Sequence, residues 1–129
     1  MNDLKLVFNR QKEFFNLRKT NDINFRINNL KKLKQVIKEN EDKVLDALKK
    51  DLGKSNFESY ATEVGLIYDE INTHIKNIKK WSKIEKSKSP IVYYPAKSYI
   101  YKEPYGVTLI IGPFNYPFQL VIAPLIGAI

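Results

Sequence analysis

The sequence contains no cysteine and a single histidine, His74. The lack of cysteine excludes disulfides, thiolate nucleophiles and cysteine-bound zinc from these residues. One histidine does not make a metal site by itself, so we predict no metal site. His74 flanks the apolar stripe of a predicted helix, and this position is typical of a surface or boundary histidine.

Arginine is scarce, although the chain is basic, with a formal net charge of +8. A basic chain is suited to nucleic acid or to an anionic membrane surface. However, only Arg10, Arg18 and Arg26 are arginines, and base recognition and bidentate phosphate contacts favour arginine over lysine. The lysines therefore indicate a solvated surface, and we predict no nucleic-acid partner. A basic nucleic-acid-binding helical domain is kept as an alternative.

Charged residues are absent after Glu103. Residues 105–129 are numerous enough to span a bilayer, but three prolines and two amide side chains interrupt them, which argues against a transmembrane helix. Residues 1–19 carry charges throughout and lack the apolar core of a signal peptide. We therefore predict a cytoplasmic protein without a membrane span.

The first two thirds of the chain are predicted to be helical. Apolar side chains recur there at three- and four-residue steps, which is typical of helices with one buried face. The predicted helices cover residues 3–19, 23–39, 41–52 and 56–82.

Capping residues mark where these helices begin and end. Asp22 and Asn40 precede the second and third helices and can act as N-caps. Gly53 follows the third helix and suits a left-handed C-terminal position. Ser55 and Glu58 have the spacing of a capping box, which predicts the start of the longest helix.

The helical spacing of the apolar residues ends at Pro90. Residues 91–94 and 98–101 are rich in β-branched and aromatic side chains, which predicts two short strands. Residues 90–102 are therefore predicted to form a strand pair. Residues 107–111 form an apolar run that suits a parallel strand covered on both faces. An apolar helix follows from Pro117 to Ile129, and Pro124 should kink or interrupt it because proline lacks an N–H.

This order of elements predicts an α/β fold, in which N-terminal helices precede the first strand–turn–helix of a cofactor domain. One parallel strand needs partners of matching character, and the remaining sequence offers none. We therefore expect residues 1–129 to be the N-terminal portion of a longer protein.

Two motifs near the C-terminus resemble those of the aldehyde dehydrogenase family. Glu103-Pro104-Tyr105-Gly106 matches the entry into a strand, and Gly112-Pro113-Phe114-Asn115-Tyr116-Pro117 matches the turn that follows. The resemblance covers roughly residues 10–129 and is strongest to the branch of fatty and medium-chain aldehyde dehydrogenases. It implies a Rossmann-like cofactor domain, of which residues 1–129 would be the N-terminal part.

The resemblance implies a role for Asn115. In the family, a cysteine thiolate attacks the aldehyde, and the amide of the motif asparagine donates a hydrogen bond to the resulting oxyanion. Hydride then passes to NAD or NADP, and a glutamate-activated water hydrolyses the thioester. From the residues alone, Asn115 is instead interpreted as the N-cap of the helix that starts near Pro117, because asparagine is a favoured capping residue.

Further roles follow from the same resemblance. The positions Ile111, Gly112, Pro113 and Phe114 would line the dinucleotide site, whereas plain packing at a strand end is their other interpretation. Tyr116 would lie near the aldehyde substrate, or it is simply an aromatic at a helix start. The strand pair at 90–102 resembles the oligomerisation arm of the family, which implies a homo-oligomer.

The sequence lacks the residues that start the reaction in the family. It has no cysteine, and the general-base glutamate and the glycine-containing cofactor turn of the family have no counterpart in residues 1–129. We therefore expect this chain alone to be inactive as a dehydrogenase. The remaining alternative is a non-catalytic helical module whose apolar C-terminal segment docks on a partner.

Overall fold

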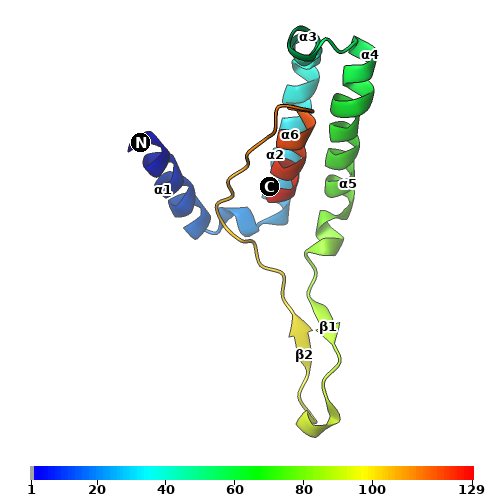
Figure 1. Cartoon of the computed structure of the whole chain (residues 1–129). Coiled ribbons are helices and arrows are strands. Elements are labelled where there is room, and N and C mark those ends of the chain that lie inside the picture. The colour runs from blue at the N-terminus through cyan, green and yellow to red at the C-terminus, as the bar shows by residue number, and fades with distance from the viewer. Residues whose placement is uncertain (1) are drawn as a thin grey trace.

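A computed structural model describes residues 2–129, which are mainly helical (Figure 1). The long helices match the predicted ranges closely, because their apolar periodicity and their caps are local signals. The elements in the first part of the chain are α1 (Asn2–Asn16), α2 (Ile23–Glu39), α3 (Glu41–Leu52), α4 (Asn56–Ser59) and α5 (Gly65–Trp81).

Three of the four predicted caps are confirmed. The Asp22 carboxylate accepts a hydrogen bond from the Asn24 amide at 2.9 Å, and Ser55 Oγ accepts one from the Glu58 amide at 3.1 Å. Gly53 has a φ of 69°, in the left-handed region that glycine adopts without a steric cost. Asn40 lies at the N-cap position of α3 as predicted, but its side chain makes no cap hydrogen bond: its Oδ1 accepts from Lys43 Nζ, and its amide nitrogen donates to the Val36 carbonyl of the preceding helix.

The predicted long helix contains a feature that the periodicity did not indicate. A π-helical turn, η2 (Tyr60–Val64), joins α4 to α5, and the Gly65 amide donates to the Tyr60 carbonyl five residues earlier. A Cβ atom on residue 65 would lie 3.0 Å from that carbonyl oxygen, so glycine suits this tight turn. Such π turns insert one extra residue and thereby change which side chains face inward.

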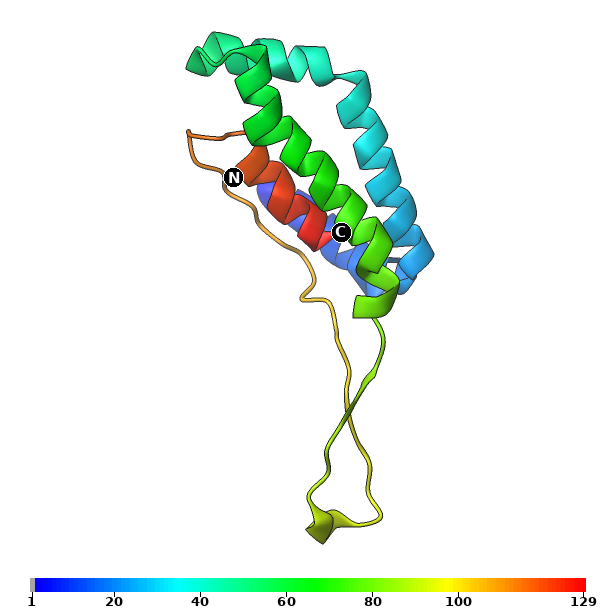
Figure 2. The same ribbon diagram turned by 90° about the vertical axis from the view of Figure 1, so that its right-hand side faces the viewer.

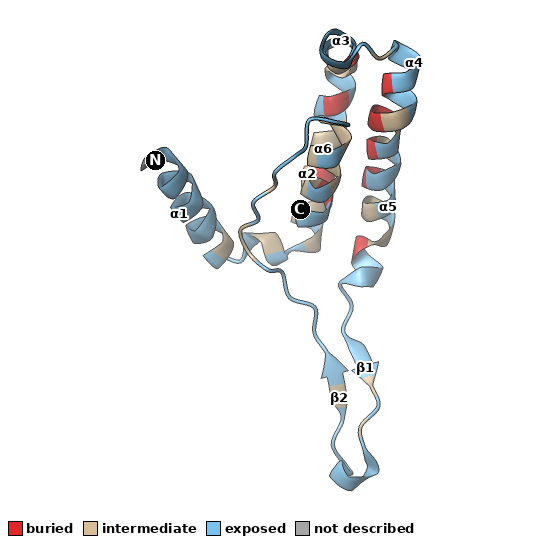
Figure 3. Ribbon diagram, viewed as in Figure 1, coloured by how far each residue is buried: buried red, intermediate tan, exposed pale blue. Residues whose placement is uncertain are grey.

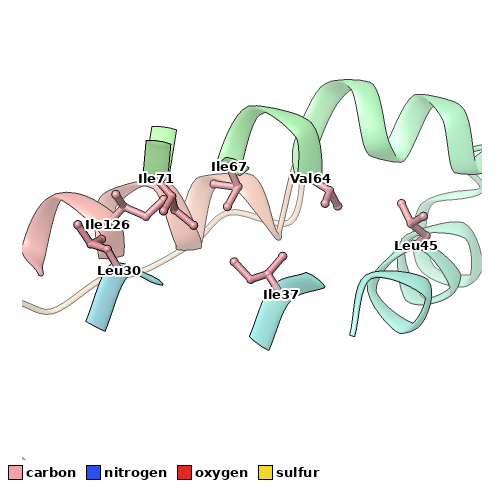
Figure 4. Close-up of a cluster of buried hydrophobic side chains, with 7 residues drawn as sticks. All are labelled: Leu30, Ile37, Leu45, Val64, Ile67, Ile71 and Ile126. Atoms are coloured by element: carbon pink, nitrogen blue, oxygen red, sulfur yellow. The ribbon is translucent and has the colours of Figure 1, made fainter. Parts of the chain in front are cut away.

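The hydrophobic core lies where α2, α5 and α6 (Gln119–Ala128) pack together, with α3 closing one end (Figures 2 and 3). Its buried side chains come from elements far apart in the sequence, as Figure 4 shows. Helix α6 therefore belongs to the bundle and is packed directly against α5. The core cluster consists of Leu30, Ile37, Leu45, Val64, Ile67, Ile71 and Ile126.

Helix α1 lies to one side of this bundle (Figure 1). Its apolar side chains are largely exposed, including Leu4 at 77%. Contacts are made near its C-terminal end, where the Phe14 ring lies 6.1 Å from the Phe25 ring and Phe15 approaches Gly106. The predicted apolar face of this helix is thus present, but this chain buries little of it.

The predicted strand pair exists, but its first strand is misplaced. Strand β1 (Glu85–Ser87) pairs antiparallel with β2 (Ser98–Ile100), so that Lys86 lies opposite Tyr99. Residues Ile91–Tyr93, expected to be a strand, form a 3₁₀ turn, η3, at the tip of the hairpin. Pro90 precedes this turn and cannot donate to a ladder, which disfavours a strand there. The hairpin projects away from the helices in both views (Figures 1 and 2).

The expected strand over residues 107–111 is not formed. In the described part of the chain the sheet has two strands, and both belong to the hairpin. A strand is stabilised by ladder hydrogen bonds to a neighbour, and residues 107–111 have none beside them. The predicted α/β fold is therefore corrected to a mostly helical unit with a small antiparallel sheet.

Helix α6 also differs from its prediction. It continues through Pro124 to Ala128, so the proline does not interrupt it. Burial of Ile126 against α2 and α5 stabilises the helix beyond the proline. Over residues 2–129, we find no helix with the length and apolar character required to cross a bilayer.

Candidate functional site

Asn115 lies in the loop that leads from the extended residues 107–113 into α6, and its side chain is exposed. It does not cap the helix. The N-cap position of α6 is Phe118, three residues later, and no side chain of this local segment caps it. The N-cap interpretation of Asn115 is therefore wrong, and its carboxamide is left accessible to a ligand.

The first amides of α6 bind a side chain from a different helix. Glu63 of η2 is completely buried, and its Oε2 accepts hydrogen bonds from the Phe118 amide at 3.0 Å and the Gln119 amide at 3.2 Å. The other oxygen, Oε1, accepts a hydrogen bond from Lys54 Nζ at 2.7 Å. Both oxygens of this buried carboxylate are thus satisfied, as a buried charge requires.

Lys54 also contacts the residue that follows Asn115. Its ammonium group lies 4.0 Å from the centroid of the Tyr116 ring, which is the geometry of a cation–π interaction. Tyr116 has a φ of 48°, a left-handed backbone conformation that is uncommon for a residue other than glycine. Tyr116 therefore combines a strained backbone conformation with a side-chain contact to Lys54.

The positions predicted to line a dinucleotide site lie in the segment that precedes α6. Ile111 and Phe114 are exposed, at 83% and 88%, and Pro113 is exposed as well. Gly112 lies against α6, because a Cβ atom there would come within 2.2 Å of Val121 Cγ2. These four residues directly precede Asn115 and Tyr116 in the sequence, and the large apolar side chains of Ile111 and Phe114 are largely exposed.

Sequence reasoning missed Lys54 and Glu63 as members of this site. Glu63 falls within the helix predicted over residues 56–82 and received no role of its own, because it does not match the general base of the family. The helical spacing carried no signal for this role, because Glu63 lies beside the apolar positions Ala61, Val64 and Ile67 and enters the interior through the π turn.

His74 occupies the boundary position that was predicted. Its Nδ1 lies 3.4 Å from a carboxylate oxygen of Glu70, and its ring packs edge-on against Trp81 at 5.1 Å. Within residues 2–129 the acidic and histidine side chains form no cluster of three with the arrangement of a metal site.

Two clefts formed by residues 2–129 lie away from Asn115. One of about 530 Å³ is formed by the end of α1, the start of α2 and the segment near Gly106, with Phe25, Arg26 and Pro104 in its wall. Neither this cleft nor the larger one beside Trp81 includes Asn115 or Tyr116. The loop at Asn115 is an open surface in this chain.

Comparison with known proteins identifies the protein family of this chain. The family model described as "Aldehyde dehydrogenase family" matches residues 2–129. The chain belongs to the aldehyde dehydrogenase family. The resemblance inferred from the two C-terminal motifs is confirmed.

Among its relatives in the aldehyde dehydrogenase family is the 4,4'-diaponeurosporen-aldehyde dehydrogenase of Staphylococcus aureus, which is 51% identical over 100% of this chain and 28% of the relative. A solved structure, the substrate-bound state of Staphylococcus aureus AldH, matches with a TM-score of 0.95 at 51% identity. It covers 99% of this chain and 28% of that protein. The helical unit described above is thus the fold of the N-terminal part of an aldehyde dehydrogenase.

The name of a mammalian relative states a cofactor preference and an assembly for that protein. The "aldehyde dehydrogenase, dimeric NADP-preferring" of Rattus norvegicus is 38% identical over 100% of this chain and 28% of the relative. The chain thus spans less than a third of the length of these relatives. It contains no cysteine, so it does not itself carry the thiolate nucleophile of an aldehyde dehydrogenase.

Proposed function

We propose that this chain is the N-terminal part of the nucleotide-binding domain of an NAD- or NADP-dependent aldehyde dehydrogenase, which oxidises aldehydes to carboxylic acids. Within it, Asn115 supplies a hydrogen bond to the oxyanion that forms when a cysteine thiolate attacks the aldehyde. The observation that carries this role is that the Asn115 carboxamide is exposed while the helix beginning beside it is anchored through Glu63.

A neutral carboxamide is suited to this task. Its N–H groups donate a hydrogen bond to a negative oxygen without needing an ionised side chain, and they act most strongly where water is excluded. Pro113 and Pro117 restrict the backbone on either side of Asn115, so less orientational freedom is lost when the oxyanion forms. A single donor of this kind typically contributes about 10²–10³ in turnover.

Ile111, Gly112, Pro113 and Phe114 form the part of the dinucleotide site that this chain contributes. Bound NAD or NADP would supply the hydride acceptor. The residues fit such a group, because exposed apolar side chains at Ile111 and Phe114 offer surface for a planar ring, and these side chains lack internal packing. Gly112 holds this segment close to α6.

Tyr116 is the residue of this chain that we assign to the aldehyde side of the site. It follows Asn115 directly, and the residue is 40% exposed although Lys54 lies over one face of its ring. A partly exposed aromatic ring offers apolar surface to an aldehyde chain.

The hairpin of β1 and β2 is proposed to be an oligomerisation arm. It projects from the helices, and its tip exposes Ile91 at 92% and Tyr94 at 87% (Figure 3). Contiguous exposed apolar side chains on an extended arm are typical of a surface that a second protein chain covers. A homo-oligomer of the complete enzyme and a cytoplasmic location both stay predictions.

The role of Asn115 is tested in a complete enzyme. We suggest a chimera in which this chain replaces the matching N-terminal part of the Staphylococcus aureus relative. Asn115→Ala should lower kcat by about 10²–10³ while the dissociation constant of the cofactor stays near that of the parent chimera. Asn28→Ala removes an exposed amide from α2 and serves as the matched control. Unchanged turnover in Asn115→Ala would show that the amide has no oxyanion role.

One observation favours the alternative of a helical interaction module. Large apolar side chains are exposed along residues 105–114, including Tyr105 and Leu109. A surface of this kind needs a covering partner, and the isolated chain should therefore associate. Size-exclusion chromatography of the 129-residue chain measures this association, and an aldehyde oxidation assay of the same sample should detect no activity, because the chain has no cysteine.

A further inference from the structure

The Glu63 carboxylate is the only acidic group, among the described residues, that the structure places at the start of α6. The first turn of α6 has no acidic residue of its own. A helix N-terminus carries a partial positive charge and free amides, and a carboxylate there stabilises it. Glu63 provides this stabilisation from 55 residues earlier in the sequence.

Burial makes the position of this carboxylate well defined. Glu63 is 0% exposed, and the side chain of its partner Lys54 is 13% exposed. A buried ion pair contributes little net stability compared with apolar packing, because both charges must be desolvated. It does favour one arrangement of its surroundings over others, since any displacement leaves a buried charge without its partner.

Lys54 extends the same arrangement to Tyr116. Its ammonium group donates to Glu63 Oε1 and also lies over the Tyr116 ring. The short segment that contains Asn115 is therefore held at two points on its C-terminal side. One is the ring of the very next residue, and the other is the backbone of Phe118.

The π turn η2 contributes to this geometry. It places both Glu63 and Val64 in the interior, although they are consecutive residues on a helix with one buried face. Val64 joins the apolar core, while Glu63 reaches the start of α6. Gly65 accommodates the turn, because its lack of a Cβ leaves room for the Tyr60 carbonyl.

We propose that Glu63 and Lys54 are positioning residues for the reaction, and that they fix the orientation of the Asn115 carboxamide through the start of α6 and the Tyr116 ring. This inference rests on the proposed oxyanion role of Asn115. Neither residue touches the reacting atoms. Their effect passes through Asn115, because displacing a catalytic donor by about 1 Å can cost roughly 10²-fold in rate.

The test is a double-mutant cycle in the chimera described above. Glu63→Gln should lower kcat by about 10- to 100-fold and leave KM for the cofactor nearly unchanged. Glu58→Gln is the matched control, because Glu58 is exposed on α4 and the same chemical change is made. In the Asn115→Ala background, Glu63→Gln should have little additional effect on kcat, because the donor that it positions is absent.

The outcomes separate the two proposals. If Asn115→Ala leaves kcat unchanged, the oxyanion role is wrong. If Asn115→Ala lowers kcat but Glu63→Gln lowers it by the same factor in both backgrounds, the oxyanion role stands and the positioning inference is overturned. Equal effects of Glu63→Gln and Glu58→Gln would overturn it as well.

Variants of Lys54 keep the proposal testable if the Glu63→Gln protein does not fold. Lys54→Met keeps the aliphatic stem and removes the charge, and Lys54→Arg restores it. We expect Lys54→Met to lower kcat and Lys54→Arg to recover most of the loss. In the 129-residue chain, Lys54→Met should also shift the amide resonances of Tyr116 and Phe118 in ¹⁵N spectra, whereas Lys50→Met, at an exposed lysine, should not. Unshifted resonances in Lys54→Met would contradict the proposal.

Discussion

A Cβ atom added at Gly112 would come within 2.2 Å of Val121 Cγ2, so the extended segment and α6 are in direct contact at this point. Valine is short and branched at Cβ, and its side chain has few alternative rotamers. It cannot withdraw from an added methyl group as a long flexible side chain does. Because Gly112 has no side chain, the extended segment can pack directly against α6, next to the proposed cofactor surface.

Gly112→Ala is expected to lower the free energy of unfolding by about 1–3 kcal/mol, which is the usual cost of overpacking. Urea denaturation of the 129-residue chain measures this change. Val121→Ala in the same molecule should recover part of the loss, since it removes the clashing methyl groups. Gly127→Ala is the control, because a Cβ there meets no atom within 4 Å. Equal costs for Gly112→Ala and Gly127→Ala would contradict the contact.

Tyr68 is predicted to make stability fall at alkaline pH. Burial raises the pKa of its hydroxyl well above the ordinary value, and the hydrogen bond to the Glu41 carboxylate, 2.6 Å away, raises it further. The unfolded chain therefore loses this proton first as the pH rises above about 10. The stabilisation is fully present below pH 10 and is lost progressively above it, because the unfolded state then binds fewer protons.

Tyr68→Phe isolates this contribution. Near pH 8 it should lower the free energy of unfolding by about 1–3 kcal/mol, because a hydrogen bond to a charged group is lost. The difference between the two proteins should shrink as the pH rises above about 10. Tyr94→Phe, at an exposed tyrosine of the hairpin tip, is the control. A difference that stays constant with pH would argue against the raised pKa of Tyr68.

Ile126 is predicted to anchor α6 to the bundle. Its side chain is 1% exposed and lies in the same cluster as Leu30 and Ile71 (Figure 4). Ile126→Ala should lower the free energy of unfolding by about 2–5 kcal/mol, as is usual for a buried aliphatic side chain. Leu120→Ala, at a more exposed position of the same helix, should cost clearly less. Similar losses in the two variants would mean that α6 is not docked through Ile126.

The helices could be predicted from the sequence because their determinants lie close together along the chain. Gly53 ends α3 in a left-handed conformation, and Ser55 caps α4, as their residue types indicated. Asn40 lies at the N-cap position of α3, but its side-chain oxygen accepts from Lys43 Nζ at 3.0 Å and not from an amide of α3. Local competition between two hydrogen-bond partners is not resolved by residue type alone.

The strands were predicted less well, because a strand depends on its neighbour. Residues 107–111 have the composition of a buried strand, yet no strand lies beside them within residues 2–129. The first strand of the hairpin is the polar segment Glu85–Ser87 and not the aromatic residues that follow Pro90. Pairing with β2 decided this choice, and intrinsic propensity did not.

The sequence by itself determined the helical order of the chain, its lack of a cysteine nucleophile and the motif that contains Asn115. Only the tertiary structure revealed Glu63 and Lys54 beside that motif. Nothing in the local sequence links Glu63 to the Phe118 amide, since 55 residues separate them. Their contact forms because α6 packs against α5 and brings a buried carboxylate to the positive end of a helix.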